Sequence, residues 1–144
     1  MRTFEINDEI LGDLELDAES SVLNGSIEKA GKVIGIVSEV DLTKQSTIDR
    51  AVDTTKMIFS KYEELVPALS LYAGENIPEE IKAASGLSAE QIADLLELKV
   101  FGSDGRVSDE TTYTFYFGNE ELLDDVLIEV SGSLEKGPKG CEIG

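Results

Sequence analysis

The sequence contains no histidine and no tryptophan, and its single cysteine is Cys141. Histidine is the most common metal ligand and general base in proteins near neutral pH. Its absence excludes a zinc site built from cysteine and histidine, and it excludes a serine or cysteine nucleophile activated by histidine. A single cysteine also cannot form an internal disulfide. The sequence therefore favours a protein that is not an enzyme and that uses no cofactor.

Long apolar segments are also missing. No run of apolar residues approaches the roughly 18 residues that a membrane-spanning helix requires. Residues 1–5 lack the apolar stretch of an export signal, so we expect a cytoplasmic protein that does not enter a membrane. Hydrophobic residues nevertheless make up 41% of the 144 residues, which suits the core of one domain over residues 1–144.

Positive charge is scarce. Twelve lysines and arginines stand against 30 aspartates and glutamates, and the formal net charge is −18. Such a surface repels nucleic acid and anionic membranes and attracts basic partners. The same charge also keeps a protein soluble. The composition leaves both interpretations open, a surface for a basic partner and a surface that is only solvated.

The first third of the chain shows the alternation of apolar and polar residues that is typical of β-strands. Over residues 10–17, leucines alternate with acidic residues. Residues 20–28 form a second predicted strand, unless the Asn-Gly pair at 24–25 makes a turn. After a turn at 29–32, the apolar run 33–37 predicts a central strand that is covered on both faces.

The middle third changes to helical periodicity. Over residues 48–73, apolar side chains recur at spacings of three and four. Pro67 lies inside this pattern, so the helix is predicted to kink or divide there, and Gly74 is predicted to stop it. Two short helices are then predicted, one ended by Gly86 and one that begins with a capping box at Ser88.

The last third returns to strands. Strands are predicted near residues 98–101, 111–117 and 126–131, with a turn at 103–106 and an acidic loop at 119–125. The remaining glycine-, lysine- and proline-rich residues are interpreted as a tail that carries a dispensable thiol.

The order of strands, helices and strands predicts an α+β fold. We expect the N- and C-terminal strands to form one antiparallel sheet, with the central helical segment packed on one face. Neither group of strands could bury its apolar face alone, which favours a single domain.

Two groups of carboxylates are the candidate partner-binding residues, because such groups can hold a partner rich in arginine and lysine. The strand carboxylates alternate along the first predicted strand and its end: Asp13, Glu15, Asp17 and Glu19. The loop carboxylates lie in the predicted acidic loop: Glu120, Glu121, Asp124 and Asp125. Each group also has a simpler interpretation, as the wet face of a half-covered sheet and as a solvated loop. The loop lacks the EF-hand spacing, so no metal site is predicted.

Other chemical motifs are weak or absent. The aromatic residues of 113–117 resemble a stacking platform for nucleic acid, but basic residues are missing around them, so we expect them to pack in the core. No glycine-rich phosphate motif is present. Paired carboxylates can hydrolyse glycosides, but nothing identifies such a pair, and a sugar cleft generally also needs aromatic platforms.

Four short segments in the last third follow a common order of strand, aromatic strand, closing strand and chain end. They are Leu98-Lys99-Val100, Phe115-Tyr116-Phe117, Ile128-Glu129-Val130 and Glu142-Ile143-Gly144. Over about residues 90–144, this pattern resembles a family of short bacterial proteins of unknown function. Family members often carry a Gly-His pair where this chain has Asp125-Val126, so no role of that histidine carries over. Some relatives resemble immunity proteins of secreted bacterial toxins, which implies a protein partner.

Three functions are therefore considered. The leading hypothesis is a non-enzymatic acidic binding protein, an immunity protein that neutralises a basic toxin domain. The second is a homodimeric structural module joined through an open strand edge. The third is a metal-dependent hydrolase that uses clustered carboxylates.

Overall fold

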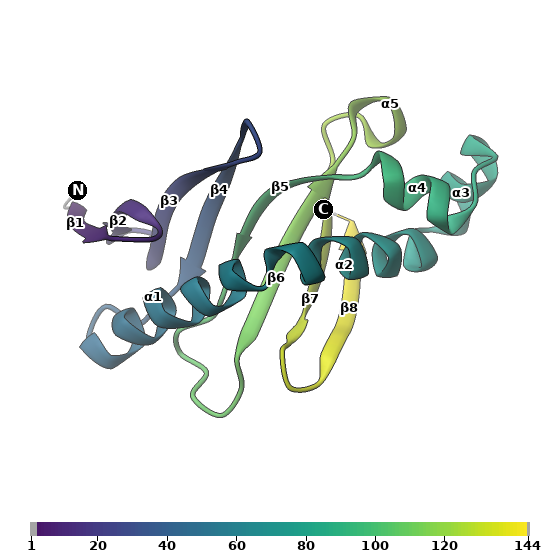
Figure 1. Cartoon of the computed structure of the whole chain (residues 1–144). Helices are drawn as coiled ribbons and strands as arrows, with labels where there is room; N and C mark the ends of the chain where they lie inside the picture. The colour runs from purple at the N-terminus through teal and green to yellow at the C-terminus, as the bar shows by residue number, and fades with distance from the viewer. Residues whose placement is uncertain (1–2, 144) are drawn as a thin grey trace.

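The protein forms a sheet whose strand order follows the sequence. A computed structural model describes residues 3–143, with eight strands in one sheet (Figure 1). The N-terminal strands are β1 (Thr3–Asp8), β2 (Gly12–Asp17), β3 (Val22–Lys29) and β4 (Lys32–Glu39). The C-terminal strands are β5 (Glu97–Gly102), β6 (Thr112–Gly118), β7 (Ile128–Ser133) and β8 (Gly137–Ile143). The helices are α1 (Gln45–Ser60), α2 (Tyr62–Asn76), α3 (Glu79–Ser85), α4 (Ala89–Leu95) and α5 (Glu120–Leu123).

The two halves of the sheet meet at a parallel pair. Among the described strands, β4 and β5 run parallel, and every other neighbouring pair is antiparallel. A parallel pair needs a long crossover, and residues 40–96 provide it with α1 to α4 on one face of the sheet (Figure 1). The predicted α+β fold is confirmed, with a largely antiparallel sheet of N- and C-terminal strands and the helical segment on one face.

The core lies between the helices and the face of the sheet that is turned toward them, called here the inner face. On β6, Tyr113, Phe115 and Phe117 point inward and are at most 2% exposed. Their neighbouring rings lie 5.6 and 6.2 Å apart. From α1, the ring of Phe59 stacks on that of Phe101 of β5 at 6.1 Å. The predicted core position of the aromatic strand is confirmed for these three side chains.

Buried hydroxyl groups reinforce the parallel pair where its short ladder ends. Ser38 Oγ of β4 accepts a hydrogen bond from the backbone N–H of Ser103 at 3.0 Å. The same oxygen lies 2.9 Å from Thr55 Oγ1 of α1. Ser38 and Thr55 are fully buried. The Ser38 hydroxyl therefore satisfies a backbone donor after β5 and links both halves of the sheet to α1.

The first hairpins largely follow the prediction. The turn at 29–32 joins β3 to β4 through Ala30 and Gly31, whose φ angles of 54° and 80° suit a two-residue hairpin turn. Asn24 and Gly25 do not form a turn, because they lie inside β3 and pair with β4. The strand β1 was not predicted, although its backbone pairs with β2 along its whole length.

β4 is a central strand, but the prediction that both of its faces are covered is wrong. Ile34 and Ile36 are buried beneath the helices, whereas Val33 and Val37 are 70% and 40% exposed. The reason is that the connection between β4 and β5 places α1 to α4 on one side only (Figure 1). A continuous apolar run therefore marks a half-covered strand in this protein.

The long middle helix divides at Lys61 and not, as predicted, at Pro67. Lys61 has φ −104° and ψ 15°, and Pro67 lies within α2. Pro67 lies six residues after this break, in the second turn of α2, so the helix continues through it without the hydrogen bond that a backbone N–H at this position would donate to the Glu63 carbonyl. Gly74 does not stop the helix either, since α2 continues past it. A Cβ atom at Gly74 would lie 2.4 Å from the Ala89 carbonyl oxygen, so glycine allows α2 and α4 to touch.

The two predicted short helices are confirmed as α3 and α4. Gly86 ends α3 with φ 68°, in the left-handed region that glycine adopts readily. In the capping box of α4, the Ser88 N–H donates to Gln91 Oε1 at 2.9 Å, and the Gln91 N–H donates to Ser88 Oγ at 3.2 Å. Within residues 3–143, no helix combines the length and hydrophobicity needed to cross a bilayer.

The residues interpreted as a tail form the edge strand β8, which pairs with β7. Proline is tolerated at a sheet edge because one side of the strand makes no ladder bonds. Pro138 pairs with Gly132 beside a register shift, where Lys139 of β8 is the extra residue. Cys141 is half-buried in this strand opposite Val130, and burial raises the pKa of its thiol. A raised pKa lowers the fraction of reactive thiolate, so we interpret Cys141 as a packing residue of the sheet rather than a reactive thiol.

Candidate functional site

The sheet has a second face, turned away from the helices, which we call the outer face. On β2, the buried Leu14 and Leu16 point inward, so the alternating Asp13 and Glu15 point outward and are exposed. No helix from α1 to α4 covers this face within the described residues (Figure 1). The sheet therefore offers one broad surface to solvent or to a partner.

Asp13 and Glu15 form an acidic depression on the outer face. Glu15 pairs with Glu5 of β1 on one side and with Asn24 of β3 on the other. A hollow of about 340 Å³ is lined by Glu5, Asp13, Glu15, Asn24, Gly25 and Ser26. Like charges directly opposite each other on a sheet destabilise it. A cation bound beside Glu5 and Glu15 would relieve this repulsion.

The other two strand carboxylates behave differently. Asp17 ends β2, and hydrogen bonds from the Ser20 side chain and from the Glu19 backbone N–H lower its pKa. Its carboxylate therefore stabilises the turn that follows β2 by accepting these hydrogen bonds. Glu19 is exposed in that turn, beyond the end of the strand. The four strand carboxylates are thus not one ladder but a pair on the outer face and a pair at the turn.

The loop carboxylates lie in and after a one-turn helix rather than in an open loop. Asn119 caps α5 by accepting a hydrogen bond from the Leu122 N–H at 2.9 Å, and its amide donates to the Leu95 carbonyl at 3.0 Å. Glu120 and Glu121 are exposed in the first turn of α5. The buried Leu123 anchors the helix in the core.

Asp124 and Asp125 follow α5 as exposed residues of a tight turn. The Val126 N–H donates to the Leu123 carbonyl at 3.1 Å and closes this turn. Asp124 has φ 59° and ψ −127°, a conformation that favours glycine. The acidic side chains therefore sit on a strained connection between α5 and β7.

The strand carboxylates and the loop carboxylates do not come together. β2 is the second strand from one edge of the sheet, whereas α5 joins β6 to β7 in the other half. Figure 1 shows the two regions at opposite ends of the molecule. One small partner surface could not contact both groups, so they define two separate acidic surfaces.

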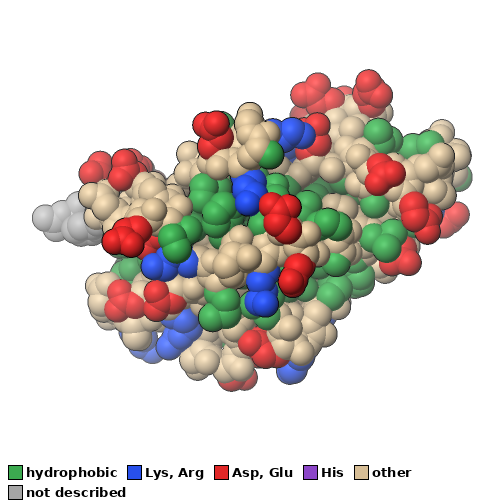
Figure 2. Space-filling view, in the orientation of Figure 1, with side chains coloured by type: hydrophobic (Ala, Val, Ile, Leu, Met, Phe, Trp, Pro, Cys, Tyr) green, Lys and Arg blue, Asp and Glu red, His purple; other side chains and the backbone are tan. Residues whose placement is uncertain are grey.

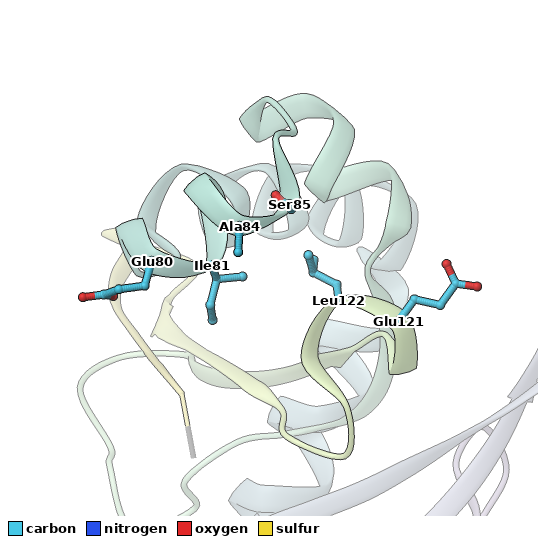
Figure 3. Close-up of a pocket in the computed structure, with 6 residues that line it drawn as sticks. All are labelled: Glu80, Ile81, Ala84, Ser85, Glu121 and Leu122. Atoms are coloured by element: carbon cyan, nitrogen blue, oxygen red, sulfur yellow. The ribbon is translucent and has the colours of Figure 1, made fainter.

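A groove between α3 and α5, which no sequence pattern predicted, lies beside the loop carboxylates. Its first part is a hollow of about 290 Å³ lined by Glu80, Ile81, Ala84, Ser85, Glu121 and Leu122 (Figure 3). An adjoining hollow of about 400 Å³ shares Ile81, Glu121 and Leu122 with it. The available signal was the pair Ile81 and Ala84, three residues apart on a short acidic helix.

Three carboxylates outside the two candidate groups have lowered pKa values. Hydrogen bonds from the side chains of Thr43, Lys99 and Arg106 lower the pKa values of Asp41, Glu97 and Asp104, respectively. A general acid needs a pKa near the working pH, so these three groups are unsuited to that role. Among residues 3–143, no group of three or more cysteine, aspartate or glutamate side chains is placed to hold a metal ion.

The fold and its surfaces thus define an acidic α+β protein with one uncovered sheet face and a separate acidic groove. No protein-family model, curated protein or solved structure matches the chain. The resemblance of about residues 90–144 to a family of short bacterial proteins of unknown function therefore stays a prediction.

Proposed function

We propose that the protein is a non-enzymatic binding protein that holds a basic protein partner against the outer face of its sheet. The observation that carries this proposal is the open outer face, on which an acidic depression lies beside exposed apolar residues. The charge draws in a cationic surface, and the apolar residues supply area that gains from burial.

The apolar part of this surface lies on β4 and β5. Val33 and Val37 point outward from β4, and Gly35 between them pairs with Val100 of β5. A single exposed valine is ordinary on a protein surface. Here the two valines flank Gly35, where an added Cβ would lie 3.2 Å from a methyl carbon of Val100. The half-buried Val100 therefore adjoins the two exposed valines in one apolar strip. Such a strip with a polar margin is typical of a protein-binding surface.

The net charge of −18 also affects how a partner arrives. A strongly charged surface steers an oppositely charged partner during diffusion and raises the association rate, with a steep dependence on salt. We infer that the partner is a cationic domain in the cytoplasm, such as a toxin domain that acts on nucleic acid and needs a basic surface for it. The protein would act as an immunity protein by covering that surface.

A homodimer is the alternative proposal, because the described sheet ends in two edge strands, β1 and β8. The exposed Glu5 in β1 and the exposed Lys139 and Glu142 in β8 oppose edge-to-edge pairing, as does the shared negative charge. Pro138 in β8 removes a further backbone donor. These features favour a basic partner over a second copy of the chain.

The test compares three forms of the protein as bait in extracts of the native host at low salt. One is the wild type, one is Asp13→Lys with Glu15→Lys on the outer face, and one is the control Glu64→Lys with Glu75→Lys on α2. Both variants change the net charge equally, and all four positions are exposed. Retained proteins are identified by mass spectrometry, and their affinities are measured by calorimetry at two salt concentrations.

We expect a basic protein that binds the wild type and the control, is lost with the outer-face variant and dissociates as salt rises. Equal retention by all three forms would contradict the outer face as the binding surface. A concentration-dependent dimer in sedimentation, insensitive to salt and without any retained partner, would favour the homodimer instead.

A further inference from the structure

The groove between α3 and α5 has an apolar floor and an acidic rim. Figure 3 shows Ile81 and Ala84 of α3 and Leu122 of α5 directed toward the space between the two helices. The carboxylates of Glu80 and Glu121 point away from this space on opposite sides. The groove therefore separates its two kinds of chemistry, with hydrocarbon inside and negative charge around it.

The second part of the groove continues the same pattern. Its apolar lining adds Leu123, Val126 and Ile143, and its acidic lining adds Glu120 and Asp124. None of the described residues lining either part is a lysine or an arginine. Figure 2 shows acidic side chains over α5 and near α3, with hydrophobic side chains between them.

The floor is incompletely covered by the chain itself. Ile81 and Leu122 are half-buried, and none of the residues of α3, all within the described part of the chain, is fully buried. Each hollow is near the lower end of the roughly 300–1,000 Å³ that is typical of ligand pockets, a size that suits one or two apolar side chains. The opening between two short helices suits an extended or helical segment of a partner.

From this arrangement, we propose that the groove between α3 and α5 binds a short basic segment of a protein partner. Its apolar side chains cover Ile81 and Leu122, and its lysines or arginines face the rim carboxylates. The proposal rests on the proposed function in taking a basic protein as the partner, but it assigns a surface separate from the outer face. It also gives Glu120, Glu121 and Asp124 a role that the strand carboxylates cannot share.

Charge selects this occupant over a second copy of the chain. A second copy would bring a net charge of −18 to a rim that is already acidic, and like charges brought together oppose association. An acidic or neutral apolar segment would bury the apolar floor without neutralising the negative charge of the rim carboxylates. A segment that is both basic and apolar satisfies the two halves of the groove together.

The test uses the full chain labelled with ¹⁵N and a twelve-residue probe peptide of leucine and lysine at near-physiological salt. Two control peptides replace either all leucines with serine or all lysines with glutamine. Binding is followed by fluorescence anisotropy and by the chemical shifts of backbone amides. The protein variants are Glu121→Lys and Leu122→Ser, with Glu64→Lys on α2 as the charge-matched control. Glu64 and Glu121 are both exposed in the first turn of a helix.

We expect the largest shifts at residues 80–85 and 120–126, and binding about tenfold weaker for each control peptide and for Glu121→Lys, while Glu64→Lys binds as the wild type does. If Leu122→Ser fails to fold, Glu121→Lys still decides the result. Chemical-shift changes confined to β2, β3 and β4 would overturn the proposal that the groove binds the peptide, but they would be consistent with binding at the outer face. No binding, or equal weakening by Glu121→Lys and Glu64→Lys, would also overturn the groove. The proposed function is tested separately, by capture of a basic partner from extracts of the native host.

Discussion

Removing the Ser38 hydroxyl should destabilise the protein more than removing the Thr55 hydroxyl, although the two groups contact each other. Ser38 Oγ accepts from the backbone N–H of Ser103 and lies 2.9 Å from Thr55 Oγ1. Ser38→Ala leaves a buried backbone donor without its partner, which costs about 1–3 kcal/mol, and also removes the hydroxyl pair, worth about 1 kcal/mol. We therefore expect a loss of about 3 kcal/mol from the free energy of unfolding.

Thr55→Val removes the hydroxyl pair and the longer contact of Thr55 Oγ1 with Ser103 Oγ at 3.4 Å, but it leaves the bond between Ser38 and the Ser103 backbone, so its expected cost is about 1–2 kcal/mol. In the double variant the shared bond is lost only once. The two single effects should therefore exceed the effect of the double variant by about 1 kcal/mol. Urea unfolding followed by circular dichroism suits this measurement, because the chain has no tryptophan to report by fluorescence.

Equal destabilisation by Thr55→Val and Ser38→Ala would contradict a special role of the Ser38 hydroxyl as the acceptor for the Ser103 backbone. Full additivity of the two effects would contradict the shared hydrogen bond, since the hydroxyl groups would then act independently.

Three further predictions concern the backbone and one acidic group. Asp124→Gly should stabilise the protein by about 1 kcal/mol in thermal unfolding, because glycine adopts the positive φ of this turn without strain; a lower melting temperature would contradict this. Gly102→Ala should cost more than about 3 kcal/mol or prevent folding in urea titration, because its Cβ would lie 1.7 Å from the Val37 carbonyl oxygen; near wild-type stability would refute the close contact. Burial raises the pKa of Asp8, but hydrogen bonds from Leu11, Lys56 and Ile10 outweigh it and lower the pKa below 3.8. The stability from this lowered pKa is present above pH 3.8 and is lost as the pH falls through the folded-state pKa. Asp8→Asn should therefore make the free energy of unfolding fall less steeply as the pH is lowered. An unchanged slope would argue against this role of Asp8.

The sequence predicted elements whose signals are local. The alternation around Leu14 and Leu16 predicted β2, and the capping box at Ser88 predicted α4, since both depend on residues close in the chain. The turn at 29–32 was predicted for the same reason. Local patterns therefore described the parts of the fold whose neighbours in space are also neighbours in sequence.

The errors arose where tertiary contacts decide the structure. Pro138 suggested a tail, but it lies at the sheet edge in β8, beside the register shift at which Lys139 is left without a partner in β7. Gly74 suggested a helix end, but its missing side chain admits the backbone of α4. The continuous apolar run of β4 suggested two covered faces, yet the exposure of Val33 depends on which face the helices occupy.

The candidate surfaces were predicted only in part. The outward direction of Asp13 and Glu15 follows from alternation along one strand, and the sequence was sufficient for it. The groove needs Ile81 and Leu122 from segments about forty residues apart to face each other, and no periodicity within either segment reports that. The packing of α5 against α3 therefore had to come from the structure.

The strand order has a consequence for how quickly the chain can reach its native state. Every described pair of neighbouring strands except β4 and β5 is joined by a connection much shorter than residues 40–96, so hairpins can form by local search. The meeting of Gly35 with Val100 instead closes a long loop, and loop closure carries an entropic barrier. Refolding should be limited by this single closure, so substitutions at the meeting point would slow refolding, while those in the outer hairpins would mainly hasten unfolding.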